Sequence, residues 1–271
     1  MRSRNKQRER GAALAAVLGL VAIAATIATG LLQTRSAEMV RSESIQSARQ
    51  AFIFIKGIEG HIANALSQSA GIDQLFANNG CRSPRLPVEL ANLDIVVQVE
   101  NLHCRFNINS LASSQSGQRL FVDLIDALTL QGRLSEVDGR VLRSQIIAWL
   151  SPQEAAPYLT ADGETQLTAG QLFRSVSELS LLPGMSNAQW QALSPYVTAL
   201  PVGDPFIDLE HSPDPLPEVL QRAEASGHQG TIRFIQVEAA VSLNERVFHQ
   251  CTVIDLEQSA ILLRERVPCL P

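Results

Sequence analysis

The sequence predicts an α+β protein in which a long N-terminal helix packs on an antiparallel sheet and a large all-α domain is inserted. Three observations support this prediction: an uncharged apolar stretch that continues as an amphipathic helix, alternating strand patterns, and a helical block between those strands. The chain has 271 residues, of which 45% are hydrophobic. This length and composition suit one or two globular cores and a single apolar helix, and argue against several membrane spans.

The first element is an apolar segment directly behind a basic leader. Residues 12–32 contain no charged side chain, and such a helix is long enough to cross a hydrocarbon core of roughly 30 Å. The leader is basic and is opposed only by Glu9; its basic residues are Arg2, Arg4, Lys6, Arg8 and Arg10. A basic leader before an apolar helix keeps the N-terminus in the cytoplasm and directs the following chain outward.

Three interpretations of this segment remain open. A secretory signal peptide would be cut near Ala24, although its apolar run is usually only about 7–15 residues long. An uncleaved anchor fits the length equally well. In the third interpretation, the order of basic leader, Gly11 and apolar helix resembles the class III leader of type IV prepilins and type II secretion pseudopilins. That resemblance implies cleavage between Gly11 and Ala12 by a prepilin peptidase at the cytoplasmic face, and N-methylation of Ala12.

The helical pattern continues beyond the apolar segment. Apolar residues recur mostly at intervals of three and four and predict one buried face: Val40, Ile45, Ala48, Phe52, Ile55, Ile58, Ile62 and Leu66. Charged residues fill much of the remainder: Arg35, Glu38, Arg41, Glu43, Arg49, Lys56 and Glu59. We therefore expect one helix over residues 12–69, with its second part packed on a soluble domain.

The middle of the chain begins with strand signals and then becomes helical. Residues 93–100 are rich in β-branched side chains, and Asn101-Leu102 is expected to turn the chain into a second strand over residues 104–109. Helical spacing follows over residues 120–130 and 137–150, with Gly132 and Pro152 as stop signals. Another helix pair is expected between residues 177 and 201.

The last part of the chain returns to strand patterns. A short strand is expected over residues 206–209 and a helix over residues 218–226. Three alternating runs then cover residues 231–242, 246–257 and 260–267, separated by short connections. These runs predict an antiparallel meander.

Charge and cysteine content limit the partners and the compartment. The leader has a net charge of +4 and the whole chain −5, so the chain without its leader carries −9. This acidity argues against nucleic acid as a partner, because that binding depends on Lys and Arg. The four cysteines form two couples, Cys81 with Cys104 and Cys251 with Cys269, whose spacing favours local disulfides in an oxidising compartment. Two other connectivities and free buried thiols remain alternatives.

Motifs of known chemistries argue against an enzyme. The sequence has no HExxH zinc motif, no Gly-x-Ser-x-Gly nucleophile elbow and no P-loop. His211 and Asp214 lie in a Pro-rich loop, where polar side chains are expected to face solvent, and this explains them better than metal binding. The segment Leu182–Met185 resembles the hairpin of helix-hairpin-helix DNA binders, but Arg174 is the only cation between residues 171 and 201. We interpret this hairpin as a packing feature.

Two further motifs give a specific family resemblance. The segments over residues 104–111 (Cys-Arg-Phe-Asn-Ile-Asn-Ser-Leu) and 177–201 (Ser-Glu-Leu followed by Pro-Gly-Met and Pro-Tyr-Val-Thr-Ala-Leu-Pro), together with the leader, resemble the K-type minor pseudopilins of type II secretion systems. The resemblance implies a pilin-like fold and five segments. These are a leader (residues 1–11), a transmembrane helix (12–32), a periplasmic helix with first strands (33–110), an inserted helical domain (111–201) and C-terminal strands (202–271).

The resemblance also implies a function. A K-type protein would sit at the pseudopilus tip with the I- and J-type minor pseudopilins, associate with them through its N-terminal helix in the inner membrane, and help initiate assembly and protein export. Most pseudopilins carry a glutamate at the fifth mature position, where this chain has Ala16; K-type proteins are similar in lacking it. Two alternatives are a minor pilin of a type IV pilus and a membrane-anchored periplasmic binding domain.

Calcium is the cofactor that the resemblance suggests, and here the sequence departs from the family. K-type proteins have an acidic loop after a Trp-Leu pair, but Ser151 and Gln153 replace the expected aspartates after Trp149. Asp162 and Glu164 remain as weak calcium candidates, which is few for an ion that takes six to eight oxygen ligands. The segment over residues 206–210 also departs from the asparagine-rich family pattern.

Overall fold

A computed structural model of the chain describes its backbone at residues 3–66, 72, 75–76, 80–90, 93–150, 158–159, 165–166, 170–182, 185–205, 207–208, 211–222 and 232–269. Within the first of these ranges, side chains are described at residues 26, 29, 30, 35 and 38–66. The chain divides into two compact units, Met1–Phe52 and Ile53–Pro271. The second unit contains the sheet and the shorter helices.

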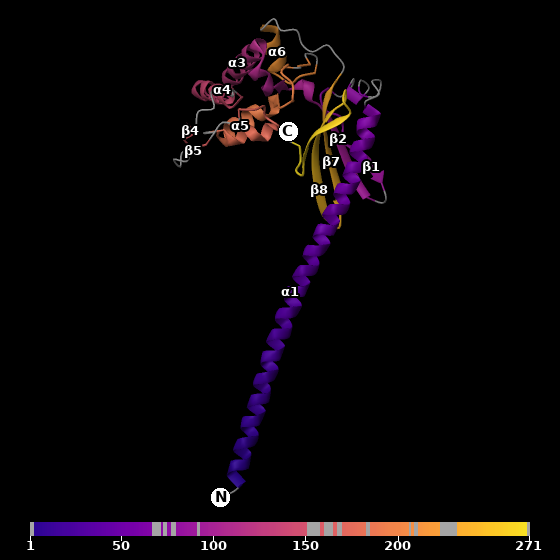
Figure 1. Cartoon of the computed structure of the whole chain (residues 1–271), viewed down its shortest axis with the longest axis vertical. Helices are drawn as coiled ribbons and strands as arrows, with labels where there is room; N and C mark the ends of the chain where they lie inside the picture. Colours follow the sequence, from indigo (N-terminus) through magenta and orange to yellow (C-terminus); the bar gives the residue numbers. More distant parts are fainter. Residues whose placement is uncertain are drawn as a thin grey trace. The chain divides into compact units, whose positions relative to one another are not determined.

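The first element is the long helix α1, Ser3–Leu66, which runs through both units (Figure 1). The sequence predicted a helix over residues 12–69, so the observed helix begins earlier, inside the basic leader. No proline interrupts the chain before Pro84, which allows the uninterrupted helix. Across the part of the chain that the structure describes, no helix has the length and apolarity needed to cross a membrane. Most side chains of residues 12–32, on which the expected transmembrane segment rests, lie outside that part.

The second unit contains a five-stranded antiparallel sheet in the order β1-β2-β7-β8-β9. Its strands are β1 (Leu86–Leu90), β2 (Leu93–Asn101), β7 (Phe234–Leu243), β8 (Arg246–Asp255) and β9 (Ala260–Glu265). The predicted C-terminal meander is confirmed as β7-β8-β9. The turn from β7 to β8 uses positive φ angles at Asn244 and Glu245 (51° and 60°), the backbone that a tight two-residue hairpin requires.

The prediction of a second strand over residues 104–109 is correct only at Phe106 and Asn107. The chain instead forms the 3₁₀ helix η1 (Leu102–Cys104), the two-residue strand β3 (Phe106–Asn107) and the 3₁₀ helix η2 (Ile108–Ala112). Two asparagines cause these turns, because the Asn101 side chain accepts from the His103 N–H (2.9 Å) and the Asn107 side chain accepts from the Asn109 N–H (3.2 Å). Strand β3 pairs in parallel with β6 (Val197–Thr198), away from the main sheet.

The helical block predicted between the strands is present. It contains α3 (Gln115–Leu130), α4 (Glu136–Leu150), the 3₁₀ helix η4 (Val176–Leu181), α5 (Asn187–Leu193) and the 3₁₀ helix η5 (Ser194–Tyr196), with the short hairpin β4 (Tyr158–Leu159) and β5 (Thr165–Gln166). Helix α3 ends before Gly132, whose φ of +70° confirms it as the predicted stop signal. The expected helix pair after residue 177 is only partly correct, because one short α-helix lies between two 3₁₀ helices.

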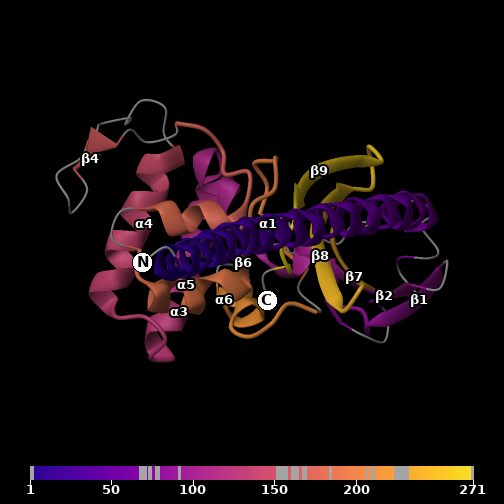
Figure 2. The same ribbon diagram turned by 90° about the horizontal axis from the view of Figure 1, so that it is seen from below.

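Between the block and the meander, the structure contains helix α6 (Leu216–Arg222), which overlaps the helix predicted over residues 218–226 and begins two residues earlier. The strand predicted over residues 206–209 is not formed at Ile207 and Asp208, the two of these residues that the structure describes. Figure 2 shows helices α3, α4, α5 and α6 gathered on one side and the five strands of the main sheet on the other. The helices enclose one apolar core that includes Phe106, Phe121, Leu124, Leu128, Ile146, Leu179, Leu193 and Val219.

Candidate functional site: the seat of the N-terminal helix

The described side chains of α1 differ in exposure along the helix. Three apolar residues of its outer part are largely exposed, with 74% of Met39, 57% of Val40 and 47% of Ile45 accessible. In the second unit, Ile55 and Ile58 are buried. The sequence predicted one buried apolar face from Val40 to Leu66; burial is confirmed at Ile55 and Ile58, whereas Val40 and Ile45 remain exposed. The part of α1 in the first unit therefore presents exposed apolar side chains.

The expected processing residues are not part of any described site. Gly11 and Ala12 both lie within the backbone of α1, but their side chains lie outside the described residues. The structure therefore gives their secondary structure alone, and cleavage between them remains a prediction.

Glu59 makes a buried polar contact between the helix and the sheet. Only 1% of this residue is exposed, and its Oε2 accepts from the Arg264 Nε of strand β9 at 2.9 Å. Its Oε1 accepts from Gln250 Nε2 and Thr252 Oγ1, both on strand β8 and both buried. The carboxylate is thus held by three donors from two adjacent strands. Such pairing is what makes burial of a charged group tolerable.

We expected Glu59 to lie with the other charged residues on the polar face of the helix, and this placement is wrong. The spacing contained the necessary signal, because Glu59 lies four residues after Ile55 and three before Ile62. It therefore belongs to the same helix face as those apolar residues. A charged residue at a core position of an amphipathic helix indicates a buried partner.

The Phe-Asn-Ile-Asn motif forms the joint between the sheet and the helical block. The Asn107 amide donates to the carbonyl oxygens of Val202 (2.8 Å) and Asp204 (2.9 Å), and its side-chain oxygen also accepts from the Leu200 N–H (3.0 Å). The Asn109 side chain bonds both backbone groups of Phe173 and the carbonyl oxygen of Leu200, each at 2.8 Å. Both asparagines are fully buried. The motif therefore acts as a structural connection that closes distant loops onto one another.

A glycine of helix α3 lets the helix approach this joint. A Cβ at Gly117 would lie 2.6 Å from the Oγ of Ser110, whose hydroxyl donates to the Asn107 carbonyl oxygen (2.7 Å). Position 117 therefore has no room for a side chain, and only glycine fits there. This close approach explains a glycine in the first turn of an otherwise ordinary helix.

A buried ion-pair group lies at the end of strand β2. The Glu100 carboxylate accepts from Arg105 Nε (2.8 Å) and from Arg82 Nη2 (2.8 Å), and both Glu100 and Arg105 are buried. The neighbouring disulfide joins Cys81 to Cys104, with Cα atoms 5.9 Å apart. Together these contacts hold the segment before β1 against the chain that leaves β2.

The second disulfide joins Cys251 of strand β8 to Cys269, with Cα atoms 4.9 Å apart. The structure therefore contains both local pairings that the spacing favoured, and all four cysteines are bonded.

An ion pair joins the end of strand β8 to the residue before β7: Asp255 accepts a hydrogen bond from Arg233 Nη2 at 2.8 Å. This hydrogen bond raises the pKa of Arg233 above its usual value, and the guanidinium also lies 4.8 Å from the Phe234 ring centroid.

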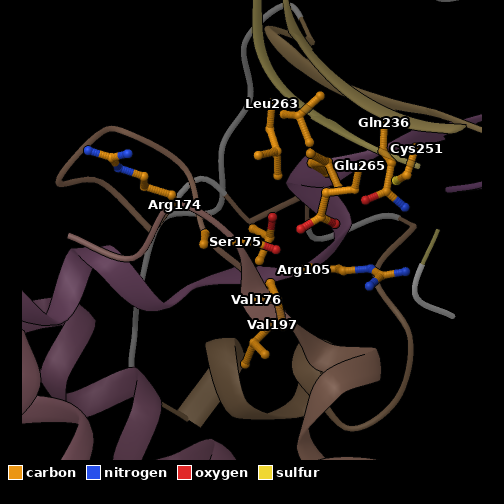
Figure 3. A pocket seen from close by; sticks show the side chains of 13 residues that line it. Arg105, Arg174, Ser175, Val176, Val197, Gln236, Cys251, Leu263 and Glu265 are labelled. Carbon is orange, nitrogen blue, oxygen red and sulfur yellow. The ribbon is translucent and has the colours of Figure 1, made fainter. Parts of the chain in front are cut away.

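A small cavity, open to solvent, lies between the sheet and the helical block (Figure 3). The side chains that line it are partly apolar and partly polar or charged. Figure 3 shows Val176 and Val197 on one side and Leu263 and Glu265 on the other. Arg105 also lines the cavity, but its guanidinium is already bound by Glu100. We therefore interpret the cavity as a gap where the sheet and the helical block meet, and not as a ligand site.

The calcium candidates Asp162 and Glu164 lie outside the described residues. Within the described ranges, no group of three or more His, Cys, Asp or Glu side chains is arranged to hold a metal ion. His211 contacts Asp208 (Nδ1–Oδ2 3.2 Å), whereas Asp214 is exposed.

The hairpin Leu182–Met185 was predicted to be a packing feature. Its residues 183–184 lie outside the described ranges, but Leu182 and Met185 on either side of them pack in the helical core.

Comparison with known proteins gives one consistent result. Residues 104–202 match the family model of type II secretion system protein K; this region contains both sequence motifs. Two curated proteins named type II secretion system protein K are similar. The one from Pectobacterium carotovorum is 26% identical over 215 residues (73% of this chain, 65% of that protein), and the one from Aeromonas hydrophila is 27% identical over 216 residues (72% and 65%). The matches thus span somewhat less than two thirds of these relatives.

A solved structure has the same fold. It is the crystal structure of the GspK–GspI–GspJ complex from the type 2 secretion system of enterotoxigenic Escherichia coli. The matched chain is 16% identical, with a TM-score of 0.61, and the match covers 84% of this chain and 100% of that one. The expected α+β architecture is confirmed. The family model and the two curated relatives agree with the family resemblance that the motifs indicated: the chain is similar to type II secretion system protein K.

Proposed function

We propose that this protein is a minor pseudopilin at the tip of a type II secretion pseudopilus, where it helps to initiate assembly and the export of folded proteins. The observation that carries this proposal is the combination of a 64-residue N-terminal helix, a sheet that binds it through Glu59, and a helical block that matches the protein K family model. The role is structural, since the related proteins are components of a secretion apparatus.

Maturation and location follow from the N-terminal sequence. A prepilin peptidase cleaves between Gly11 and Ala12 at the cytoplasmic face, and Ala12 becomes N-methylated. Residues 12–32 then anchor the protein in the inner membrane as a single pass, with the remaining chain in the periplasm. The two disulfides support an oxidising compartment of this kind.

The five segments expected from the sequence form part of the same proposal. The leader (residues 1–11) is removed, and residues 12–32 and 33–110 supply the membrane helix, the periplasmic helix and the first strands. Residues 111–201 form the inserted helical domain, and residues 202–271 complete the sheet. Phe106 and Ile108 also pack in the helical core, which favours a start of the inserted helical domain slightly before residue 111.

The partners are I- and J-type minor pseudopilins, which contact this protein through its N-terminal helix. Two observations support this assignment: the fold is shared with a chain of the GspK–GspI–GspJ complex, and Met39, Val40 and Ile45 present apolar surface on α1. Exposed apolar side chains on a helix are suited to association with other helices.

Co-purification tests the proposal directly. The full chain, tagged at its C-terminus, is produced with the I- and J-type minor pseudopilins of one type II system and extracted in mild detergent. We expect both partners to elute with the tagged chain, and export of folded enzymes to stop in a strain that lacks it. The control lacks residues 12–32 and should retain neither partner. A wild-type chain that elutes alone, or a deletion strain that loses type IV pili and keeps secretion, would overturn the assignment.

A further inference from the structure

Three donors on the sheet converge on a single acceptor position. Gln250 and Thr252 are two residues apart on strand β8, so both side chains lie on the same face of the sheet. Arg264 is the β9 residue directly opposite Thr252 in the strand register. Gln250 Nε2 also donates to Thr252 Oγ1 (3.4 Å), which orients the two groups before any acceptor arrives. The sheet therefore presents a site that fits one carboxylate.

The apolar contacts of the helix do not specify a position in the same way. Ile55 and Ile58 bury apolar surface, and apolar burial is nondirectional and proportional to area. Because a helix repeats every 5.4 Å along its axis, a shift by one turn would still bury apolar side chains. The same shift would remove Glu59 from its three donors and leave a buried charge unpaired, which is strongly unfavourable.

We infer that Glu59 is a positioning residue that fixes the axial and rotational register of the N-terminal helix on the sheet. The carboxylate and its three donors are satisfied together at one height and one rotation of the helix. A buried polar group that sets register is the best-attested use of such groups in helical assemblies. This conclusion concerns the fold of the second unit and stands without any partner.

The consequence of a fixed register rests on the proposed function. In a pseudopilus, neighbouring subunits contact one another through their N-terminal helices, and each periplasmic domain follows the helix that carries it. A helix that slid on its sheet would place the domain at the wrong height for its neighbours. Glu59 would therefore transmit the position of the membrane helix to the rest of the protein.

Amide hydrogen exchange on the purified full chain separates positioning from general stability. The variant Glu59→Met keeps the length and much of the volume of the side chain but removes the acceptor. The variant Glu59→Gln keeps one oxygen for Gln250 and Thr252 and loses the charge that pairs with Arg264. The matched control is Glu43→Gln, an exposed glutamate on the same helix.

We expect exchange in residues 53–66 to be at least tenfold faster in Glu59→Met, while peptides from β2 and β7 keep their wild-type protection. Glu59→Gln should give a smaller increase, and Glu43→Gln none. An equal loss of protection in helix and sheet, or unchanged exchange in residues 53–66, would overturn the inference. If Glu59→Met does not fold, Glu59→Gln decides by the same comparison. Co-purification of the variants with the I- and J-type partners is measured separately, so failure of wild-type assembly would reject the proposed function and not the register.

Discussion

The two halves of the second unit are stabilised in different ways. The helical block has a continuous apolar core and, by sequence, no cysteine between Cys104 and Cys251. The sheet region depends on specific bonds: both disulfides, the Glu100 ion pairs and the buried Glu59 contacts. Apolar cores tolerate many arrangements, whereas charged and covalent contacts each require one geometry. The sheet region, including the place where Glu59 of the long helix meets it, is therefore the half whose geometry is specified most tightly.

The largest effect should come from the core of the helical block. Phe121 is fully buried and stacks on Phe106, with ring centroids 5.7 Å apart. We expect Phe121→Ala to reduce the free energy of unfolding by about 4 kcal/mol, because it loses apolar burial and leaves a cavity. Urea denaturation of the purified protein measures this change. Leu130→Ala, at a position that is 79% exposed, is the matched control and should change stability by less than about 0.5 kcal/mol.

Removing a disulfide tests the sheet region. The pair of substitutions Cys81→Ser and Cys104→Ser opens a loop with a sequence separation of 23 residues and should reduce the free energy of unfolding by about 3 kcal/mol. The pair Cys251→Ser and Cys269→Ser opens a loop of 18, so its effect should be equal or slightly smaller. Thermal unfolding of each double variant and of the wild type, with and without reductant, measures the two losses of stability. A larger loss from reductant than from the four substitutions together would contradict this account of the sheet.

A smaller effect is expected at the joint between the two halves. Gly117→Ala places a methyl group 2.6 Å from Ser110 Oγ, so either α3 or the Asn107 turn has to shift. We expect a loss of about 2 kcal/mol, which is typical of overpacking. The double substitution Gly117→Ala with Ser110→Ala should recover part of this loss in urea denaturation. If Gly117→Ala is as stable as the wild type, the packing described for the joint is wrong.

The smallest effect is a gain in stability, at the two glycines of α1 in the second unit. A Cβ at Gly57 or Gly60 would meet no atom within 4 Å. Each change to alanine should therefore stabilise the helix by about 0.5–1 kcal/mol, the usual difference in helix propensity. Circular dichroism during thermal unfolding measures the gain. A loss at either position would show that the added methyl group does meet neighbouring atoms, which would contradict the open space around these glycines.

Much of this architecture was predictable because its patterns are local. Alternation over residues 231–267 predicted the meander, and three- and four-residue spacing with a terminal Gly132 predicted α3 and α4. The motifs at residues 104–111 and 177–201 predicted the family, and the matching model spans both. Strand β1 was missed because it is short and contains Pro87, a residue that is rare inside strands.

The errors concern residues whose role depends on distant partners. Asn107 interrupts the strand predicted over residues 104–109, and its side chain bonds the backbone of Leu200, Val202 and Asp204 far along the chain. Glu59 was assigned to the polar face because its partners are 191 to 205 residues away along the chain. No local pattern identifies Gln250, Thr252 and Arg264 as those partners, although the position of Glu59 between Ile55 and Ile62 indicates that partners exist.

The most direct test of the account is the N-terminal sequence of the mature protein, isolated from the membranes of cells that carry a type II secretion system. We predict that the mature chain begins at Ala12, bears an N-methyl group, and still contains residues 12–32. A mature chain that begins at Met1, or at any residue beyond Ala24, would contradict it, because the long helix would then be either unprocessed or removed.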